Sequence, residues 1–177
     1  MDLSELIRRY RGPLVGLIAS WGTPWADAAE IAQDSFAEAW LHREACRGDW
    51  TQPDIFGAWL RGVARNQHRN WIRARRRRER IVKFDSPAVE QAVAATDPEG
   101  SDRIERLRQA IQRLPANQRQ AVLMHYLEET SVKDVASLLS VSPKTVEGRL
   151  YQARRALFRM LGNEPPASLI GTVLTCL

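Results

Sequence analysis

The most regular pattern of apolar and polar positions lies between residues 131 and 161. Ser131 with Asp134 predicts the start of a short helix, because a serine oxygen can cap a free backbone N–H of the first turn. After a break, Ser142 and Pro143 form a favourable start for a second, longer helix. Apolar residues then recur in that helix at spacings of three and four: Val146, Leu150, Ala153, Leu157 and Leu161. A short helix, a tight turn and a longer helix together predict a helix-turn-helix.

The outward side of the longer helix is polar and basic. We call it the reading face, and it consists of Lys144, Thr145, Glu147, Gly148, Arg149, Tyr151, Gln152 and Arg155. Such a face favours DNA binding, since it combines cations for phosphates with side chains that can bond base edges. The alternative is an ordinary helical hairpin whose charged residues are merely solvated.

Residues 3–21 and 25–41 also show apolar positions at helical spacing. The second of these helices carries an acidic face, which consists of Asp27, Glu30, Gln33, Asp34 and Glu38. A row of acids is often only a solvated surface. On a basic protein it can also dock a basic protein partner, and repulsion makes it unsuited to DNA.

A third helix is predicted over residues 56–80, after a loop at 43–55. Arginine recurs there at every fourth position, and we call this the arginine stripe: Arg61, Arg65, Arg69, Arg73 and Arg77. With a rise of about 1.5 Å per residue, successive arginines lie about 6 Å apart, close to the phosphate spacing of one nucleic-acid strand. Glu79 is the one acid between residues 61 and 80, so the charge is barely neutralised within the helix. The stripe therefore favours binding to a nucleic-acid backbone.

Residues 81–100 differ in composition from both neighbouring segments. They hold one basic and four acidic residues together with Pro87 and Pro98, which predicts a flexible linker. We therefore expect an all-α fold with two small helical domains joined by a flexible acidic linker. The expected units are residues 1–80, the linker 81–100, the helix-turn-helix domain 101–161, and a tail of unassigned role, 162–177.

Overall charge and cysteine content narrow the functional classes. The 177 residues carry a net charge of +5 and have a pI near 9.8, which favours a polyanionic partner. Two widely separated cysteines and no long apolar run predict a cytoplasmic protein without disulfides, membrane insertion or a signal peptide. Three histidines stand apart from any nucleophile or phosphate-binding loop, so we expect no enzyme activity, cofactor or metal site.

Three segments together resemble a known family. They are DAAEIAQDSFAEAW (residues 27–40), FGAWLRGVARNQHRNWIRARRRR (56–78) and RLPANQRQAVLMHYLEETSVKDVASLLSVSPKTVEGRLYQARRAL (113–157). In order and spacing these resemble the extracytoplasmic-function (ECF) sigma factors, the small two-domain group of the bacterial sigma-70 family. The resemblance covers roughly residues 3–161 and implies a factor that binds core RNA polymerase and directs it to promoters.

The resemblance also implies roles for individual residues. The segment that docks on the clamp coiled coil of the largest polymerase subunit matches Asp27, Glu30, Gln33 and Asp34. The parts that bind the −10 promoter element match Trp50, Arg61, Arg65, Asn66, Arg69, Asn70, Arg73 and Arg77. The reading face matches the −35 reader. Further implied partners are the polymerase flap region and an anti-sigma factor.

One alternative needs no polymerase. A helix-turn-helix regulator that dimerises through its first domain would bind palindromic DNA alone. A gel shift with and without core polymerase separates these two interpretations.

Overall fold

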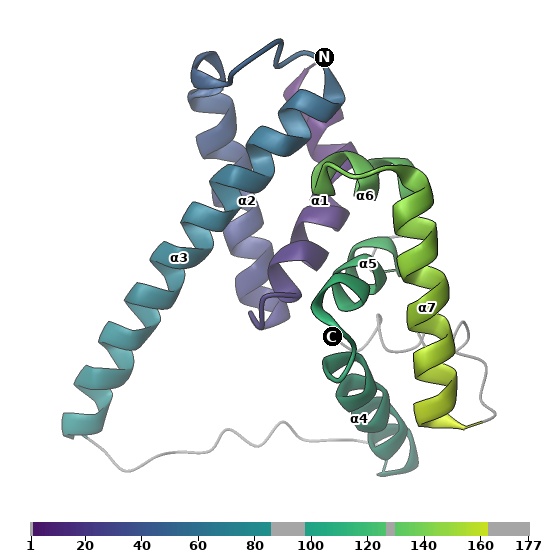
Figure 1. The fold of residues 1–177 in the computed structure, drawn as a ribbon. Helices are drawn as coiled ribbons and strands as arrows, with labels where there is room; N and C mark the ends of the chain where they lie inside the picture. The colour runs from purple at the N-terminus through teal and green to yellow at the C-terminus, as the bar shows by residue number, and fades with distance from the viewer. Residues whose placement is uncertain (1, 86–97, 127–129, 163–177) are drawn as a thin grey trace.

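The computed structural model describes residues 2–85, 98–126 and 130–162, and every regular element in these ranges is a helix (Figure 1). The expected all-α fold class is confirmed. The expected tail lies outside the described residues apart from Gly162, and so does most of the expected linker.

The first half of the chain is a bundle of three helices, α1 (Leu3–Ala19), α2 (Trp25–Leu41) and α3 (Pro53–Asp85), with a short 3-10 turn at Arg43–Ala45. Asp2 caps α1 by accepting a hydrogen bond from the Glu5 N–H at 2.7 Å. The three helices pack on one another through apolar faces. Leu6, Tyr10, Phe56 and Leu60 are fully buried in the resulting core.

The second half contains α4 (Pro98–Gln112), α5 (Ala116–Tyr126), α6 (Val132–Leu139) and α7 (Pro143–Leu161). The predicted starts of the last two helices are confirmed, because Ser131 caps α6 and Ser142 caps α7. Ser140 ends α6 in the left-handed conformation, with φ of 55°, which makes the turn between the two helices tight.

The two halves pack against each other. Helix α1 contacts α5 and α6, and α3 contacts α6, so the buried apolar residues of both halves form one continuous cluster. Figure 1 shows the α4–α7 side of the molecule lying beside α1 and the start of α3.

The helices next to the expected linker are longer than the sequence pattern predicts. Helix α3 continues to Asp85 instead of ending at residue 80, and α4 begins at Pro98. The physical reason is local: residues 81–85 contain neither glycine nor proline, and proline is well suited to the first turn of a helix. The segment between the two helices, 86–97, is outside the described residues.

Candidate nucleic-acid interface and docking face

Helix α7 presents the reading face because its opposite side is buried. Val146, Leu150, Ala153 and Leu157 are buried, as the apolar spacing predicts. The Thr145 N–H donates to the Ser142 side chain at 3.2 Å, which fixes the start of the helix. This anchoring orients the reading face away from the core.

Most of the reading face is exposed. Arg149 is half-buried, and the following residues are exposed: Lys144, Thr145, Glu147, Gly148, Tyr151, Gln152 and Arg155. The Tyr151 side chain is 58% exposed and lies beneath the Arg155 guanidinium, 5.8 Å from ring centroid to carbon. The Gln118 amide donates to Gln152 at 3.3 Å, which ties the face to α5. A Cβ added at Gly148 meets no atom within 4 Å, so the backbone of α7 is accessible there to a groove of DNA.

The arginine stripe follows α3, and four of its five members are exposed: Arg65, Arg69, Arg73 and Arg77. Glu79 pairs with Arg75, which lies outside the stripe, at 2.9 Å. The one acid in this part of the helix therefore leaves the stripe's charge in place, available to a polyanion.

Arg61 differs from the rest of the stripe. It is half-buried, and its guanidinium donates to the Leu139 carbonyl of α6 at 2.6 Å. Burial, and secondarily the charge of Arg65, lowers the pKa of Arg61. Arg61, which is predicted to contact DNA, is thus hydrogen-bonded within the protein in this structure.

The other residues predicted to contact the −10 element have distinct surroundings. Asn66 and Asn70 are exposed on α3, and Asn66 accepts a hydrogen bond from Arg69 at 2.8 Å. Trp50 is half-buried and lies edge-on to Trp40, with ring centroids 5.6 Å apart. The Trp50 ring therefore anchors the loop before α3, and its stacking on a DNA base stays a prediction.

Sequence reasoning missed the environment of His68. The ring is buried, lies 5.0 Å from the Trp21 ring centroid and stacks on Trp71 at 6.0 Å. Burial lowers the pKa of His68, which favours a neutral imidazole. The helical spacing of His68 from Leu60 and Ala64 is a signal that could have placed it in the core.

The acidic face lies on α2, opposite the buried residues of that helix. Glu30, Gln33 and Asp34 are exposed, and Asp27 is half-buried in the first turn, where a carboxylate is favoured by the helix dipole. Glu38 lies 3.5 Å from the His42 ring. The face thus offers a concentrated negative surface on a basic chain.

Two further properties concern metals and membranes. In residues 2–85, 98–126 and 130–162, no group of three or more potential metal ligands comes together. Among the helices of these same ranges, none combines the length and hydropathy needed to cross a bilayer.

Family models match both halves of the chain. The model for sigma-70 region 2 matches residues 6–78, and the model for sigma-70 region 4 matches residues 104–157. The solved structure of CnrH in complex with the cytosolic domain of CnrY shares the fold, with a TM-score of 0.53 at 23% identity, over 90% of this chain and 86% of that one.

Curated relatives agree with these models. RNA polymerase sigma-H factor of Pseudomonas aeruginosa is 30% identical over 166 residues, which span 88% of this chain and 84% of that protein. ECF RNA polymerase sigma-E factor of Salmonella typhimurium is 27% identical over 162 residues, 86% of this chain and 82% of that protein. The probable sigma factor RfaY of Xanthomonas campestris is 34% identical over 138 residues, although the match spans 32% of its length.

These relatives are sigma factors, and none supports the alternative of a stand-alone regulator. The predicted family and function are confirmed. The chain belongs to the extracytoplasmic-function sigma factors of the sigma-70 family, which bind core RNA polymerase and direct transcription initiation at promoters.

Proposed function

We propose that three separate surfaces divide the work of this sigma factor. The acidic face docks on the clamp coiled coil of the largest polymerase subunit, the arginine stripe holds the −10 element, and the reading face recognises the −35 element. In this proposal residues 1–80 form the docking and −10-binding unit, and residues 101–161 form the −35-binding unit.

The observation that carries the proposal is the segregation of charge on exposed helix faces. The acidic face on α2 and the arginine stripe on α3 are both largely exposed, although the two helices pack together. If the acidic face and the arginine stripe faced each other, their opposite charges would neutralise each other. Because both surfaces are exposed and separate, they suit two partners of opposite charge.

The two DNA-binding surfaces differ in the chemistry they offer. Arginines at constant spacing supply charge and donors that suit the phosphate backbone. The reading face adds Glu147, which accepts hydrogen bonds, and Gln152, which both donates and accepts. These two side chains suit the exocyclic amine of cytosine and the edge of adenine, respectively.

Cellular location and regulation belong to the same proposal. A factor that acts on polymerase and promoters, in a chain with a basic balance, works in the bacterial cytoplasm without an enzymatic activity of its own. An anti-sigma factor is proposed as a further partner, because CnrH, which shares this fold, was solved in complex with the cytosolic domain of CnrY.

A charge reversal tests the docking step. Glu30→Arg with Asp34→Arg cancels the negative charge of the acidic face, so we expect the chain to lose co-purification with core polymerase while its circular dichroism stays unchanged. The matched control is Asp102→Arg with Glu105→Arg, which reverses two exposed acids on α4. Recovery of the α2 double variant with core at wild-type yield contradicts the proposed docking face.

A further inference from the structure

A hydrogen bond reaches the reading face from a neighbouring helix. The Gln118 side chain, in the first turn of α5, donates from Nε2 to Oε1 of Gln152 on α7, with 3.3 Å between the two atoms. Gln152 is exposed, whereas Gln118 is half-buried. An exposed amide that is held by a second amide has a defined orientation, which a free glutamine side chain on a surface lacks.

The position of Gln118 is fixed by the start of α5. Its backbone N–H donates to the Pro115 carbonyl and to the Asn117 side chain, at 2.9 Å in both cases. The next residue, Arg119, donates from its guanidinium to the Gln112 carbonyl at 2.8 Å, which joins the start of α5 to the end of α4. The Gln118 side chain therefore extends from a backbone whose free N–H groups already have partners.

The oxygen of the Gln118 amide has a different environment from its nitrogen. Gln118 Oε1 is buried and accepts no hydrogen bond from the described residues. A buried acceptor without a donor lowers stability, so an apolar side chain would serve better at this position if packing were its only role. The contact that Nε2 makes with Gln152 explains a glutamine here better than a contribution to the core does.

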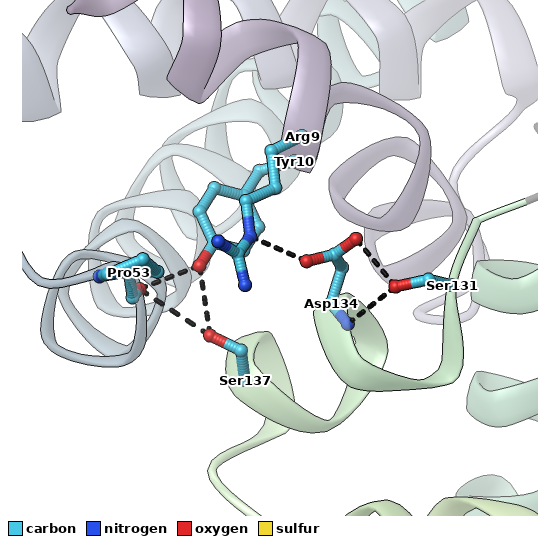
Figure 2. A network of polar contacts seen from close by, with 6 residues as sticks. All are labelled: Arg9, Tyr10, Pro53, Ser131, Asp134 and Ser137. Atoms are coloured by element: carbon cyan, nitrogen blue, oxygen red, sulfur yellow. Dashed lines mark hydrogen bonds and ion pairs between the residues drawn. The ribbon is translucent and has the colours of Figure 1, made fainter. Parts of the chain in front are cut away.

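Helix α6, which separates α5 from α7 in the sequence, is also fixed (Figure 2). Ser131 accepts a hydrogen bond from the Asp134 N–H at 3.1 Å and donates to the Asp134 carboxylate at 2.6 Å, which closes the first turn of α6. In the middle of α6, the Ser137 hydroxyl lies 2.9 Å from the Tyr10 hydroxyl of α1. Helices α5 and α7 pack directly on each other as well. The contact between the two glutamines thus joins helices whose spacing is set by the packing around them.

The direction of this hydrogen bond determines which groups Gln152 offers to DNA. Because Oε1 of Gln152 faces the Gln118 amine, Nε2 of Gln152 is free to donate to a base, and one lone pair of Oε1 remains to accept. Adenine presents an acceptor at N7 beside a donor at N6, and a glutamine amide in one orientation satisfies both. With the amide turned round, Oε1 would be the free group, which suits the exocyclic amine of cytosine.

We propose that Gln118 is a positioning residue for −35 recognition, because its hydrogen bond selects the orientation of the Gln152 amide that reads adenine. The inference rests on the proposed base reading by the reading face. It adds to that face a residue of α5, 34 positions before Gln152, that acts on base choice only through Gln152.

Substitutions of Gln118 test this role in the holoenzyme. Gln118→Glu keeps the shape of the side chain but removes its donors, so Gln152 has to donate to it from Nε2 and present Oε1 to the DNA. Gln118→Ala removes the contact and leaves the Gln152 amide free to turn. The matched control is Gln120→Glu, which makes the same change of charge two residues further along α5, on a different side of the helix. Circular dichroism checks that each variant is folded.

The readout is holoenzyme binding to promoters that carry each of the four base pairs at the −35 position whose preference is lost in Gln152→Ala. We expect the wild type to favour adenine there by about tenfold and Gln118→Glu to favour cytosine. Gln118→Ala should reduce the adenine preference at least about threefold, and Gln120→Glu should leave it unchanged. In the Gln152→Ala background, Gln118→Ala should change the base preference no further, because the two side chains act as one unit.

Each contrary result has a distinct meaning. A wild-type base preference in both Gln118 variants overturns the positioning role and leaves base reading by Gln152 intact. A loss of affinity that is equal for the four base pairs also overturns it, since such a loss indicates a structural role or a phosphate contact. If Gln152→Ala itself leaves every −35 preference unchanged, the proposed base reading by Gln152 fails, and the positioning role fails with it.

Discussion

Helices α3 and α7 are both long and basic, yet they are anchored differently. Helix α7 buries residues along most of its length, from Val146 to Leu157. Helix α3 buries residues from Phe56 to His68, whereas residues 69–79 are exposed or half-buried throughout. In Figure 1 the second half of α3 accordingly extends away from the other helices.

The way each helix is anchored matches the kind of DNA contact for which its exposed side chains are suited. Where α3 leaves the core, arginine repeats at one spacing, which provides uniform charge suited to a backbone of phosphates. Where α7 is held along its length, its outer side carries donors, acceptors and an aromatic ring at fixed positions. Reading base edges requires such fixed positions, because each hydrogen bond depends on direction.

The largest expected effect concerns the anchoring itself. Leu157 is 0% exposed, so Leu157→Ala should lower the free energy of unfolding by about 2–5 kcal/mol through lost burial and a cavity. Ile72→Ala removes a half-buried side chain from the outer part of α3 and should cost less than about 1 kcal/mol. Urea denaturation followed by circular dichroism measures both. Similar losses for the two variants would contradict the difference in anchoring between α7 and the outer part of α3.

An effect of intermediate size is expected for the arginine stripe. Each phosphate contact contributes about 0.9 to the slope of log K against log salt, so Arg65→Ala with Arg69→Ala should reduce that slope by about 2 when holoenzyme binds promoter DNA. Arg106→Ala with Arg108→Ala, two exposed arginines of α4, is the control. An unchanged slope in the Arg65 and Arg69 double variant would place both side chains on a merely solvated face.

Local patterns made much of the fold and of the sites predictable. The caps at Ser131 and Ser142 depend on neighbouring residues alone, and the structure has both. The buried positions of α7 follow directly from their spacing of three and four. For the same reason, the exposure of Glu30 and Arg65 could be expected from the periodicity of their helices.

Contacts between distant parts of the chain could not be predicted in this way. Tyr10 and Ser137 are separated by 127 positions, and each looks like an ordinary helical residue in its own segment. Arg61 fits the four-residue repeat of the predicted DNA contacts, whereas its hydrogen bond to Leu139 depends on the packing of α6 against α3. Packing between elements, which no local pattern encodes, decides these positions.

The smallest and most specific effect concerns Glu147. A carboxylate accepts hydrogen bonds only, whereas the amide of glutamine also donates, so Glu147→Gln should change preference at one position of the −35 element by about 1–3 kcal/mol. If Glu147 instead only interacts with the positive end of the α7 helix dipole, Glu147→Gln should cause a small loss of stability with no change in preference for any −35 base.

Selection of promoter variants by holoenzyme therefore tests base reading by α7 against backbone binding by α3, with wild type, Glu147→Gln, and Arg65→Ala with Arg69→Ala compared in parallel. We expect Glu147→Gln to change the selected sequence at one −35 position, whereas the double arginine variant should weaken binding and select the wild-type sequence. A −35 sequence unchanged by Glu147→Gln, or one altered by loss of the arginines, would contradict the division between base reading by α7 and backbone binding by α3.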